Sequence, residues 1–240
     1  MHDWNLTPEA AVALQRQLAA QVRTTNGFDP EAIRFVAGID ASYRQPKQGE
    51  TGDGTSYAVV VVLRFPDLEL VDQATATEPT VFPYVPGLLS FRETPPVLKA
   101  LAKLAIKPDL LMLDGQGIAH PRRFGIACHV GLLTDTPALG VAKSVLTGRY
   151  ENLGDAPGDT APLLYRGETI GMALRSKART NALILSAGHK IDLPTTVRMV
   201  LACLRGYRLP ETTRQADKIS KIIENPADSN RDTAAETSPG

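Results

Sequence analysis

The sequence has little cysteine, and this scarcity argues against a metal site built on sulfur. Cys128 and Cys203 are the only cysteines among 240 residues. Neither belongs to a CxxC pair or to another set of ligands at metal-site spacing. Because both lie in apolar stretches with a helical pattern, we expect buried free thiols in a reducing compartment.

Long apolar runs are also missing. No stretch approaches the length that a membrane span needs. The first residues, MHDWNLTPEAAV, lack a basic segment followed by an apolar core, so no secretory signal is expected. These two absences predict a cytoplasmic protein with no membrane partner.

The chain has no excess of charge of either sign. Its 26 basic and 26 acidic side chains give a formal net charge of zero. This balance argues against a protein that coats nucleic acid, but binding follows local potential, so a basic groove is still allowed. Basic residues do cluster, at Arg122 and Arg123 and again at Arg175, Lys177 and Arg179. Each cluster by itself could equally be a solvated face.

Aliphatic residues are plentiful and aromatic residues few, which suits a core packed between helices and a sheet. The length predicts one domain, which we place at residues 1–224. Residues 225–240 are polar and rich in Pro, Ser, Asp and Thr, so a disordered tail is expected.

The first half of the chain predicts a helix and three antiparallel strands. Thr7-Pro8-Glu9 is a typical helix start, and Leu14, Leu18 and Val22 recur on one face. Short turns between apolar, β-branched runs favour antiparallel pairing. We expect strands at 34–40, 57–65 and 68–77, with a polar, glycine-rich loop at 44–56.

The second half alternates strands with helices. We expect a helix at 88–106 that breaks or restarts at Pro95-Pro96, a strand at 109–114, a helix at 121–133, a strand at 137–142, a hairpin at 162–175 turning at 166–168, an apolar run at 181–186, and helices at 193–205 and 210–223. The whole pattern predicts an α/β fold with one mixed sheet and helices packed on it. A ribonuclease-H-like domain has this strand order, although other α/β folds could supply it.

Carboxylates at strand ends are the clearest chemical signal. Asp40 ends the first predicted strand (AGID), and Asp114 ends the fourth (LMLD). If these strands are neighbours, the two side chains converge, and Glu93 could add a third from a helix. Hard oxygen donors of this kind suit Mg²⁺ or Mn²⁺, whereas the acids alone would repel one another. Asp217 could complete the site if the last helix packs across the sheet.

Two further segments belong with this chemistry. Pro83 and Pro86 stiffen the segment PYVPGLLSFRE, which presents Tyr84 and leads to Glu93. Lys143 follows another strand, where it could contact a phosphate. The DGQG turn at 114–117 lets another group approach the backbone closely, but it is neither GxGxxG nor a P-loop. For His129, a core or capping role is the simplest interpretation.

Five strings occur in order: VAGIDASY, PYVPGLLSFRE, DLLMLDGQGIAHPRRFGIACHVG, GVAKS and LPETTRQAD. Together they resemble the endonuclease V family, the deoxyinosine-specific repair nucleases, from about residue 8 to residue 223. The resemblance implies a ribonuclease-H-like mixed sheet with helices on both faces. It also implies Mg²⁺-dependent hydrolysis of the second phosphodiester bond 3′ to a hypoxanthine base in DNA, which leaves 3′-hydroxyl and 5′-phosphate ends. Mn²⁺ is expected to substitute for Mg²⁺.

The resemblance also implies roles for individual residues. Asp40, Glu93 and Asp114 match the metal carboxylates, and Asp217 matches a fourth metal-site position that is His in some members. Lys143 matches the lysine beside the scissile phosphate. Tyr84 resembles a wedge that fills the space left by a displaced base. The base and nucleic-acid contacts would then come from Tyr84, Pro86, Gly87, Leu89, Gly115, Gly117, His120, Gly125, Ile126 and Leu146.

Several alternatives remain open at the level of sequence. An inosine-specific endoribonuclease would share these residues, because a contact to a ribose 2′-hydroxyl is not visible in a sequence. A ribonuclease-H-like nuclease for hybrids or junctions would need the carboxylates but not Tyr84. A binding module without catalysis would need neither the metal nor Lys143, and a nucleotide-binding enzyme using the DGQG turn lacks a phosphate motif. We expect a monomer, since no coiled-coil pattern is present.

Overall fold

The computed structural model describes residues 2–45 and 54–224. The predicted tail at 225–240 and most of the predicted loop at 44–56 lie outside these ranges. The described residues form five α-helices, a short 3₁₀ helix at Pro30–Ala32, and eight strands. The helices are α1 (Pro8–Ala19), α2 (Ser90–Leu101), α3 (Ile126–Thr134), α4 (Leu193–Ala202) and α5 (Glu211–Glu224). The strands are β1 (Phe35–Arg44), β2 (Thr55–Arg64), β3 (Glu69–Pro79), β4 (Leu110–Leu113), β5 (Ala138–Ala142), β6 (Thr160–Tyr165), β7 (Glu168–Leu174) and β8 (Leu183–His189).

The eight strands form one mixed sheet in the order β3-β2-β1-β4-β5-β8-β7-β6. The chain begins with the antiparallel meander β1-β2-β3 and then adds β4 and β5 parallel to β1. β8, β7 and β6 complete the other half by antiparallel pairing. The prediction of three antiparallel strands followed by strand–helix alternation in a mixed sheet is therefore confirmed.

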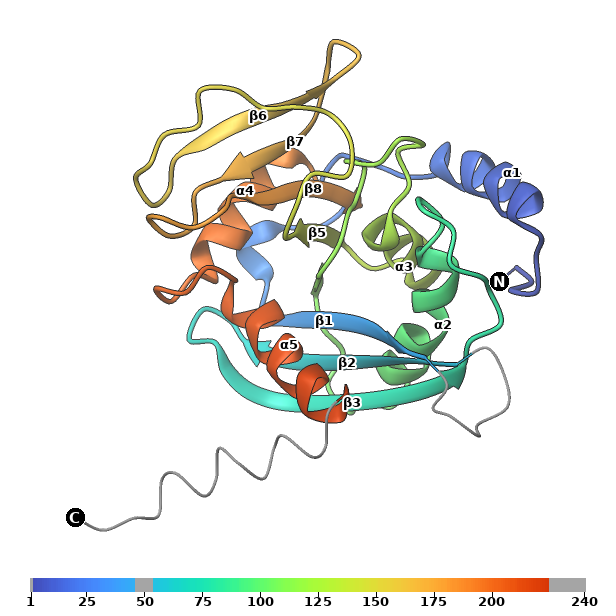
Figure 1. Cartoon of the computed structure of the whole chain (residues 1–240). Helices are drawn as coiled ribbons and strands as arrows, with labels where there is room; N and C mark the ends of the chain where they lie inside the picture. Colours follow the sequence, from blue (N-terminus) through green and yellow to red (C-terminus); the bar gives the residue numbers. More distant parts are fainter. Residues whose placement is uncertain (1, 46–53, 225–240) are drawn as a thin grey trace.

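Helices cover both faces of the sheet, as predicted (Figure 1). Successive strand residues point to opposite faces. Ala37 and Ile39 of β1 pack with residues of α2 and α3, whereas Val36 packs with residues of α4 and α5 on the other face. α1 lies outside α3, where Leu14, Leu18 and Val22 pack against Phe124 and Cys128. No helix of the described ranges is both long and apolar enough to cross a membrane.

Three predicted helices differ from those observed. α2 runs without a break through Pro95 and Pro96, so the predicted interruption is wrong, and the carbonyls of Phe91 and Arg92 lack their i+4 donors within the helix. α3 begins at Ile126 rather than near residue 121, since the chain before it turns back on itself: Gly125 N–H donates to Gly117 O at 3.0 Å. α4 ends at Ala202, earlier than predicted.

The first strand is longer than predicted, which changes the place of Asp40. β1 continues to Arg44, so Asp40 lies inside the strand rather than at its end. β1 pairs with β2 along its whole length, but its pairing with β4 stops at Ile39–Leu113. Asp40 therefore lies just past the last β1–β4 pair. Its side chain has free space there, as it would at the end of a strand.

Candidate active site

Asp40 and Asp114 are neighbours because two parallel strands stop pairing at the same level. Asp114 follows Leu113, the last residue of β4. Its backbone N–H donates to Ile39 O at 2.9 Å, which fixes it beside Asp40 on β1. Carboxylate oxygens of the two residues lie within 4.8 Å of each other, and burial and the charge of Asp114 both raise the pKa of Asp40. The prediction that these two carboxylates converge is confirmed.

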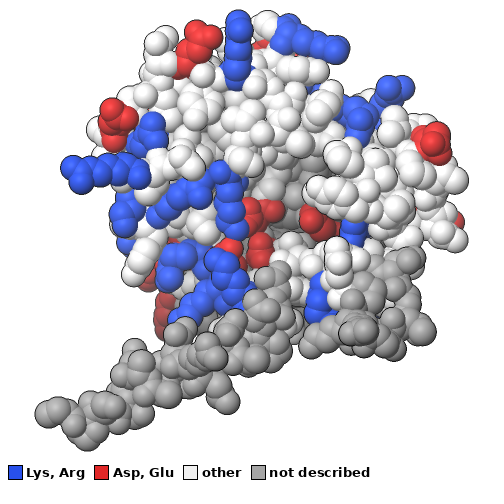
Figure 2. All heavy atoms as spheres, in the orientation of Figure 1, with Lys and Arg blue, Asp and Glu red and all other residues white. Residues whose placement is uncertain are grey.

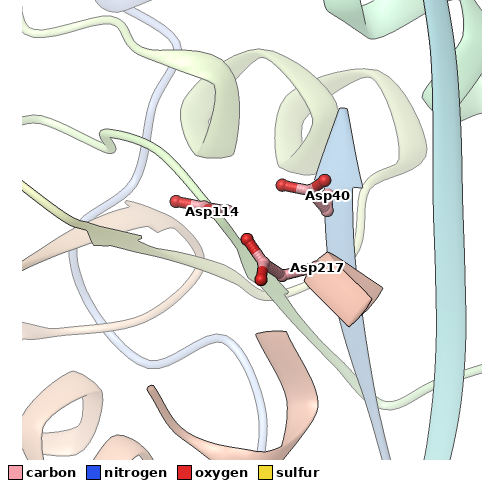
Figure 3. Close-up of side chains that lie close together, drawn as sticks. All are labelled: Asp40, Asp114 and Asp217. Carbon is pink, nitrogen blue, oxygen red and sulfur yellow. The ribbon is translucent and has the colours of Figure 1, made fainter. Parts of the chain in front are cut away.

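Asp217 reaches the same place from α5, which packs over β1 and β2 (Figures 1 and 3). Gly38 makes this approach possible, since a Cβ at that position would lie 2.0 Å from Thr212 O of α5. Carboxylate oxygens of Asp40, Asp114 and Asp217 all lie within 4.8 Å of one another. Figure 3 shows these three side chains together, coming from β1, from the end of β4 and from α5.

Two lysines border this carboxylate cluster. Lys143, directly after β5, lies 2.5 Å from Asp114 Oδ2 and donates to Asp217 Oδ1 at 2.7 Å. Lys221 donates to the other oxygen of Asp217 at 2.6 Å. Burial lowers the pKa of Lys143, but the carboxylates of Asp114 and Asp217 outweigh it and leave that pKa raised. The pKa of Asp217 is lowered, because the two lysines outweigh its burial.

The cluster is not fully neutralised by these lysines. Burial raises the pKa of the Asp40 carboxyl to about 7; Asp114 also raises it, while a hydrogen bond from Ser220 and the charge of Lys143 oppose the rise. Asp40 is only 8% exposed, so its charge is poorly solvated. A hard divalent cation would relieve this cost, and three convergent carboxylates are the donors that such a cation prefers. The residues present therefore fit a metal ion.

Glu93 lies beside the cluster rather than within it. It sits in the first turn of α2 and is not among the three acids whose oxygens converge in the described chain. Burial raises the pKa of Glu93 to about 8, and the charges of Asp40 and Asp114 add to the rise. That electrostatic effect requires proximity to both aspartates. The structure thus brings Asp217 into the centre and leaves Glu93 at its margin.

A cavity of about 330 Å³ adjoins the cluster and shares Asp114 and Lys143 with its lining. The lining comes from the segment before α2, the turn after β4, the start of α3 and the loop after β5. It includes most of the predicted base contacts: Gly87, Leu89, Gly115, His120, Gly125, Ile126 and Leu146. Residues far apart in the sequence therefore form one concave surface next to the carboxylates.

His120 is a neutral hydrogen-bond donor in this cavity. Arg122 N–H donates to its Nδ1 at 3.1 Å, so the proton belongs on Nε2, which lies 3.0 Å from Gly87 O. Burial lowers the pKa of His120 to about 4, and the charge of Arg122 acts in the same direction. Gly87 has φ +79°, a conformation that glycine adopts without strain.

Three of the predicted contact residues do not line the cavity. Tyr84 is 69% exposed, and the guanidinium carbon of Arg92 lies over its ring, 5.8 Å from the ring centroid. Pro86, next to Gly87, is exposed as well. Gly117 is buried, and a Cβ there would lie 2.1 Å from Ala187 O, so it serves the packing of the turn against β8.

Basic side chains gather beside the acidic centre. Figure 2 shows Lys and Arg gathered beside a hollow in which acidic side chains are visible. Arg208 is one basic residue tied to this region, since its Nη2 donates to Lys143 O at 2.8 Å. A protein with no net charge thus still has a group of basic side chains beside the cluster, as the sequence allowed.

Sequence reasoning missed several residues of this region. Gly38 and Ser220 leave no sequence signal, because their roles depend on how α5 meets β1. Gln116 lines the cavity, and its Oε1 has no partner among the described residues. Its position inside the DGQG turn could have marked it. By contrast, the expected core role of His129 is confirmed: it is fully buried, beside Ser90 Oγ at 3.2 Å.

Comparisons with known proteins agree with this geometry. The sequence profile of endonuclease V matches residues 16–218. The chain is 50% identical to endonuclease V of Gloeobacter violaceus over 227 residues, which is 93% of this chain and 89% of the relative. The structure of endonuclease V from Streptomyces avermitilis superposes with a TM-score of 0.85 at 41% identity, covering 93% of this chain and 96% of that one.

A fourth comparison includes a nucleic acid. A variant of endonuclease V from Ciona intestinalis, in complex with a 23mer DNA containing an inosine followed by a ribo-adenosine, superposes with a TM-score of 0.78. It is 26% identical to this chain and covers 92% of it, with 99% of that chain covered in return.

The mixed sheet and the carboxylate cluster define a metal-dependent nuclease of the ribonuclease-H-like class. Within that class the match covers most of the sequence. The chain belongs to the endonuclease V family.

Proposed function

We propose that this enzyme is a Mg²⁺-dependent DNA repair endonuclease for deoxyinosine. It would hydrolyse the second phosphodiester bond 3′ to the lesion and leave 3′-hydroxyl and 5′-phosphate ends. One observation carries the proposal: the carboxylate cluster and the cavity share Asp114 and Lys143, so a base in the cavity and a phosphate at the cluster belong to one bound strand. The DNA complex of the Ciona intestinalis enzyme contains an inosine, which supports the same substrate.

Asp40, Asp114 and Asp217 would hold the metal, with Glu93 completing the site from α2. A bound Mg²⁺ would supply an activated water and polarise the phosphate. Lys143 would then exchange its carboxylate partners for a phosphate oxygen, since its amine already lies at the border of the cluster and the cavity. Because that amine is held cationic by its neighbours, it can stabilise negative charge on the phosphate.

The cavity would hold the extruded hypoxanthine. The glycines of the lining let backbone groups approach the base edge, and His120, whose Nε2–H donates to Gly87 O, would pack beside the base. Tyr84 would fill the gap left in the duplex, and its exposed ring can stack on the neighbouring bases. A base that pairs poorly costs less to extrude, which favours the lesion. We propose that the enzyme acts as a monomer.

The test is cleavage of one labelled duplex with a single deoxyinosine, in Mg²⁺ and in EDTA, by wild type and Asp40→Ala. We expect a Mg²⁺-dependent nick one nucleotide beyond the inosine, at a rate at least about 100-fold lower in the variant. A wild-type enzyme that cuts without regard to inosine would overturn the proposal. A parallel arm with single-stranded inosine RNA would identify an endoribonuclease, and binding without cleavage would identify a module that has lost catalysis.

A further inference from the structure

Gln15 is a buried polar residue on a helix that forms no part of the active site. It lies in α1, which packs outside α3, and α1 contributes no residue to the cavity lining in the described chain. The side chain of Gln15 is nevertheless 0% exposed, whereas Gln17, two positions later, is exposed. A primary amide is costly to bury unless its hydrogen bonds are made, so the bonds of Gln15 indicate its role.

Both bonds donated by Gln15 go to walls of the cavity. Its Nε2 donates to Gly87 O at 3.1 Å and to Phe124 O at 2.7 Å. Gly87 belongs to the segment before α2, and Phe124 belongs to the segment before α3; both line the cavity. A single amide nitrogen has two hydrogens, and here each one holds a different wall. Gln15 therefore bridges the two segments between which a base would enter.

Arg122 locks this bridge in place. Its Nε donates to Gln15 Oε1, and its Nη2 donates to Gly87 O at 2.7 Å. The carbonyl of Gly87 thus accepts from Gln15, Arg122 and His120. Without Gln15 that carbonyl would still have two donors, so satisfying it does not explain the glutamine. What Gln15 adds is the link between the Gly87 wall and the Phe124 wall.

We infer that Gln15 is a positioning residue that sets the width of the base cavity and so contributes to discrimination between hypoxanthine and bulkier bases. The inference depends on the proposed function of the cavity. Guanine differs from hypoxanthine by one added amino group. A cavity whose walls are tied at a fixed separation can exclude that group, whereas a cavity whose walls move apart would admit it and would bind hypoxanthine less tightly.

The test compares Gln15→Met with Gln17→Met. Methionine keeps the length of glutamine but has no donors, and Gln17 lies exposed on the same helix. A second variant, Gln15→Glu, keeps an acceptor for Arg122 and loses both donors. Each protein is assayed with duplexes carrying deoxyinosine or deoxyguanosine at the same position, and kcat and KM are measured separately.

Both Gln15 variants should raise KM for the deoxyinosine duplex about tenfold and lower the inosine-to-guanosine ratio of kcat/KM by a similar factor. Their kcat should stay within about threefold of wild type, because the metal carboxylates lie on other elements. Gln17→Met should match wild type. If kcat falls as much as kcat/KM in both Gln15 variants, or if KM and the ratio do not change, the inference is wrong.

Hydrogen exchange without substrate gives a readout that is independent of activity. Backbone amides of residues 83–93 and 121–125 should exchange faster in both Gln15 variants than in Gln17→Met. Unchanged exchange in both segments would overturn the bridge. A wild type with no preference for deoxyinosine would instead overturn the proposed function, and the exchange data would still decide whether Gln15 holds the two walls.

Discussion

At the scale of single residues, the active site holds buried carboxylates close together, which costs stability. Three carboxylates lie within 4.8 Å, and Lys143 and Lys221 offset only part of their repulsion. The pKa of Asp40 is raised to about 7 and that of Glu93 to about 8, chiefly by burial. Without a metal, both acids therefore hold protons near neutral pH more readily than ordinary carboxyl groups. The repulsion among the carboxylates is the physical reason to expect a tightly bound cation.

Asp40→Asn should show both the cost of the buried charge and the role of Asp40 as a metal ligand. In EDTA at pH 8, where the folded wild type carries a buried charge at Asp40, the variant should melt at a higher temperature because that charge is gone. Adding Mg²⁺ should raise the melting temperature of wild type but have little effect on the variant. Thermal melts with and without Mg²⁺ measure both quantities. Equal Mg²⁺ stabilisation of the two proteins would mean that Asp40 is not a ligand.

Tyr84→Ala and Tyr84→Phe should differ in activity but not in stability. The ring is 69% exposed, so neither change should move the melting temperature by more than about 2 °C. Loss of stacking should raise KM for a deoxyinosine duplex roughly 10- to 100-fold in the alanine variant, while phenylalanine should retain most of the affinity. Steady-state kinetics on the duplex provide the measurement. If alanine behaves as wild type, the wedge role is wrong.

At the scale of elements, the centre depends on how closely α5 approaches β1. Asp217 enters the cluster only because α5 lies against the strand at Gly38, where any side chain would meet the backbone of Thr212. One turn further along, the helix places Ser220 beside Asp40 and Lys221 beside Asp217. A single glycine thus controls the distance between two halves of the metal site.

Gly38→Ala should therefore damage the metal site as well as the fold. The added Cβ would lie 2.0 Å from Thr212 O, so α5 must shift, at a cost of about 1–3 kcal/mol of unfolding free energy. We expect the Mg²⁺-induced rise in melting temperature to be lost as well. Gly171→Ala is the matched control, because a Cβ there would lie 2.5 Å from Leu185 O, away from α5. Equal Mg²⁺ responses of the two variants would refute a special role of Gly38.

At the scale of the whole molecule, a buried histidine joins the N-terminal segment to α2 and α3. His129 of α3 lies 2.8 Å from His2 Nε2 and 3.2 Å from Ser90 Oγ of α2, among the rings of Trp4, Phe91 and Phe124. Burial lowers the pKa of His129 from 6.5 to about 3, with a smaller contribution from His2. The folded protein therefore keeps this ring neutral in mild acid, where the unfolded chain protonates it.

This difference predicts the sign of a pH effect. Between pH 6.5 and about pH 3 the unfolded chain binds a proton at His129 that the folded protein does not, so stability falls as pH falls. The unfolding free energy of wild type minus that of His129→Phe should decrease by up to about 1.4 kcal/mol per pH unit below pH 6. Urea titrations of both proteins in EDTA at pH 7, 6 and 5 measure it. The titrations of Asp40 and Glu93 contribute equally to both proteins and cancel in the difference. A difference in unfolding free energy that does not change with pH would contradict the prediction.

Much of this protein follows from its sequence, because strands, turns and hairpins are specified by neighbouring residues. The β-branched run predicted at 57–65 is β2, the hairpin predicted to turn at 166–168 turns at Arg166-Gly167, and the strand predicted before the DGQG turn ends at Leu113, directly before Asp114. The order of strands and helices also predicted one mixed sheet with helices packed on it. The resemblance to endonuclease V also depends on short local motifs that occur in a fixed order along the chain.

Only the tertiary structure decided which of the candidate residues meet. The sequence marked Asp40, Glu93 and Asp114 as the metal carboxylates and Asp217 only as a fourth position, but packing placed Asp217 in the cluster and Glu93 beside it. It also left Gly117 and Pro86 outside the cavity and brought Gln15 from a distant helix to its walls. Local patterns report backbone conformation and the buried side of each element. The distance between residues far apart in the chain depends instead on how helices pack on the sheet, which no local pattern records.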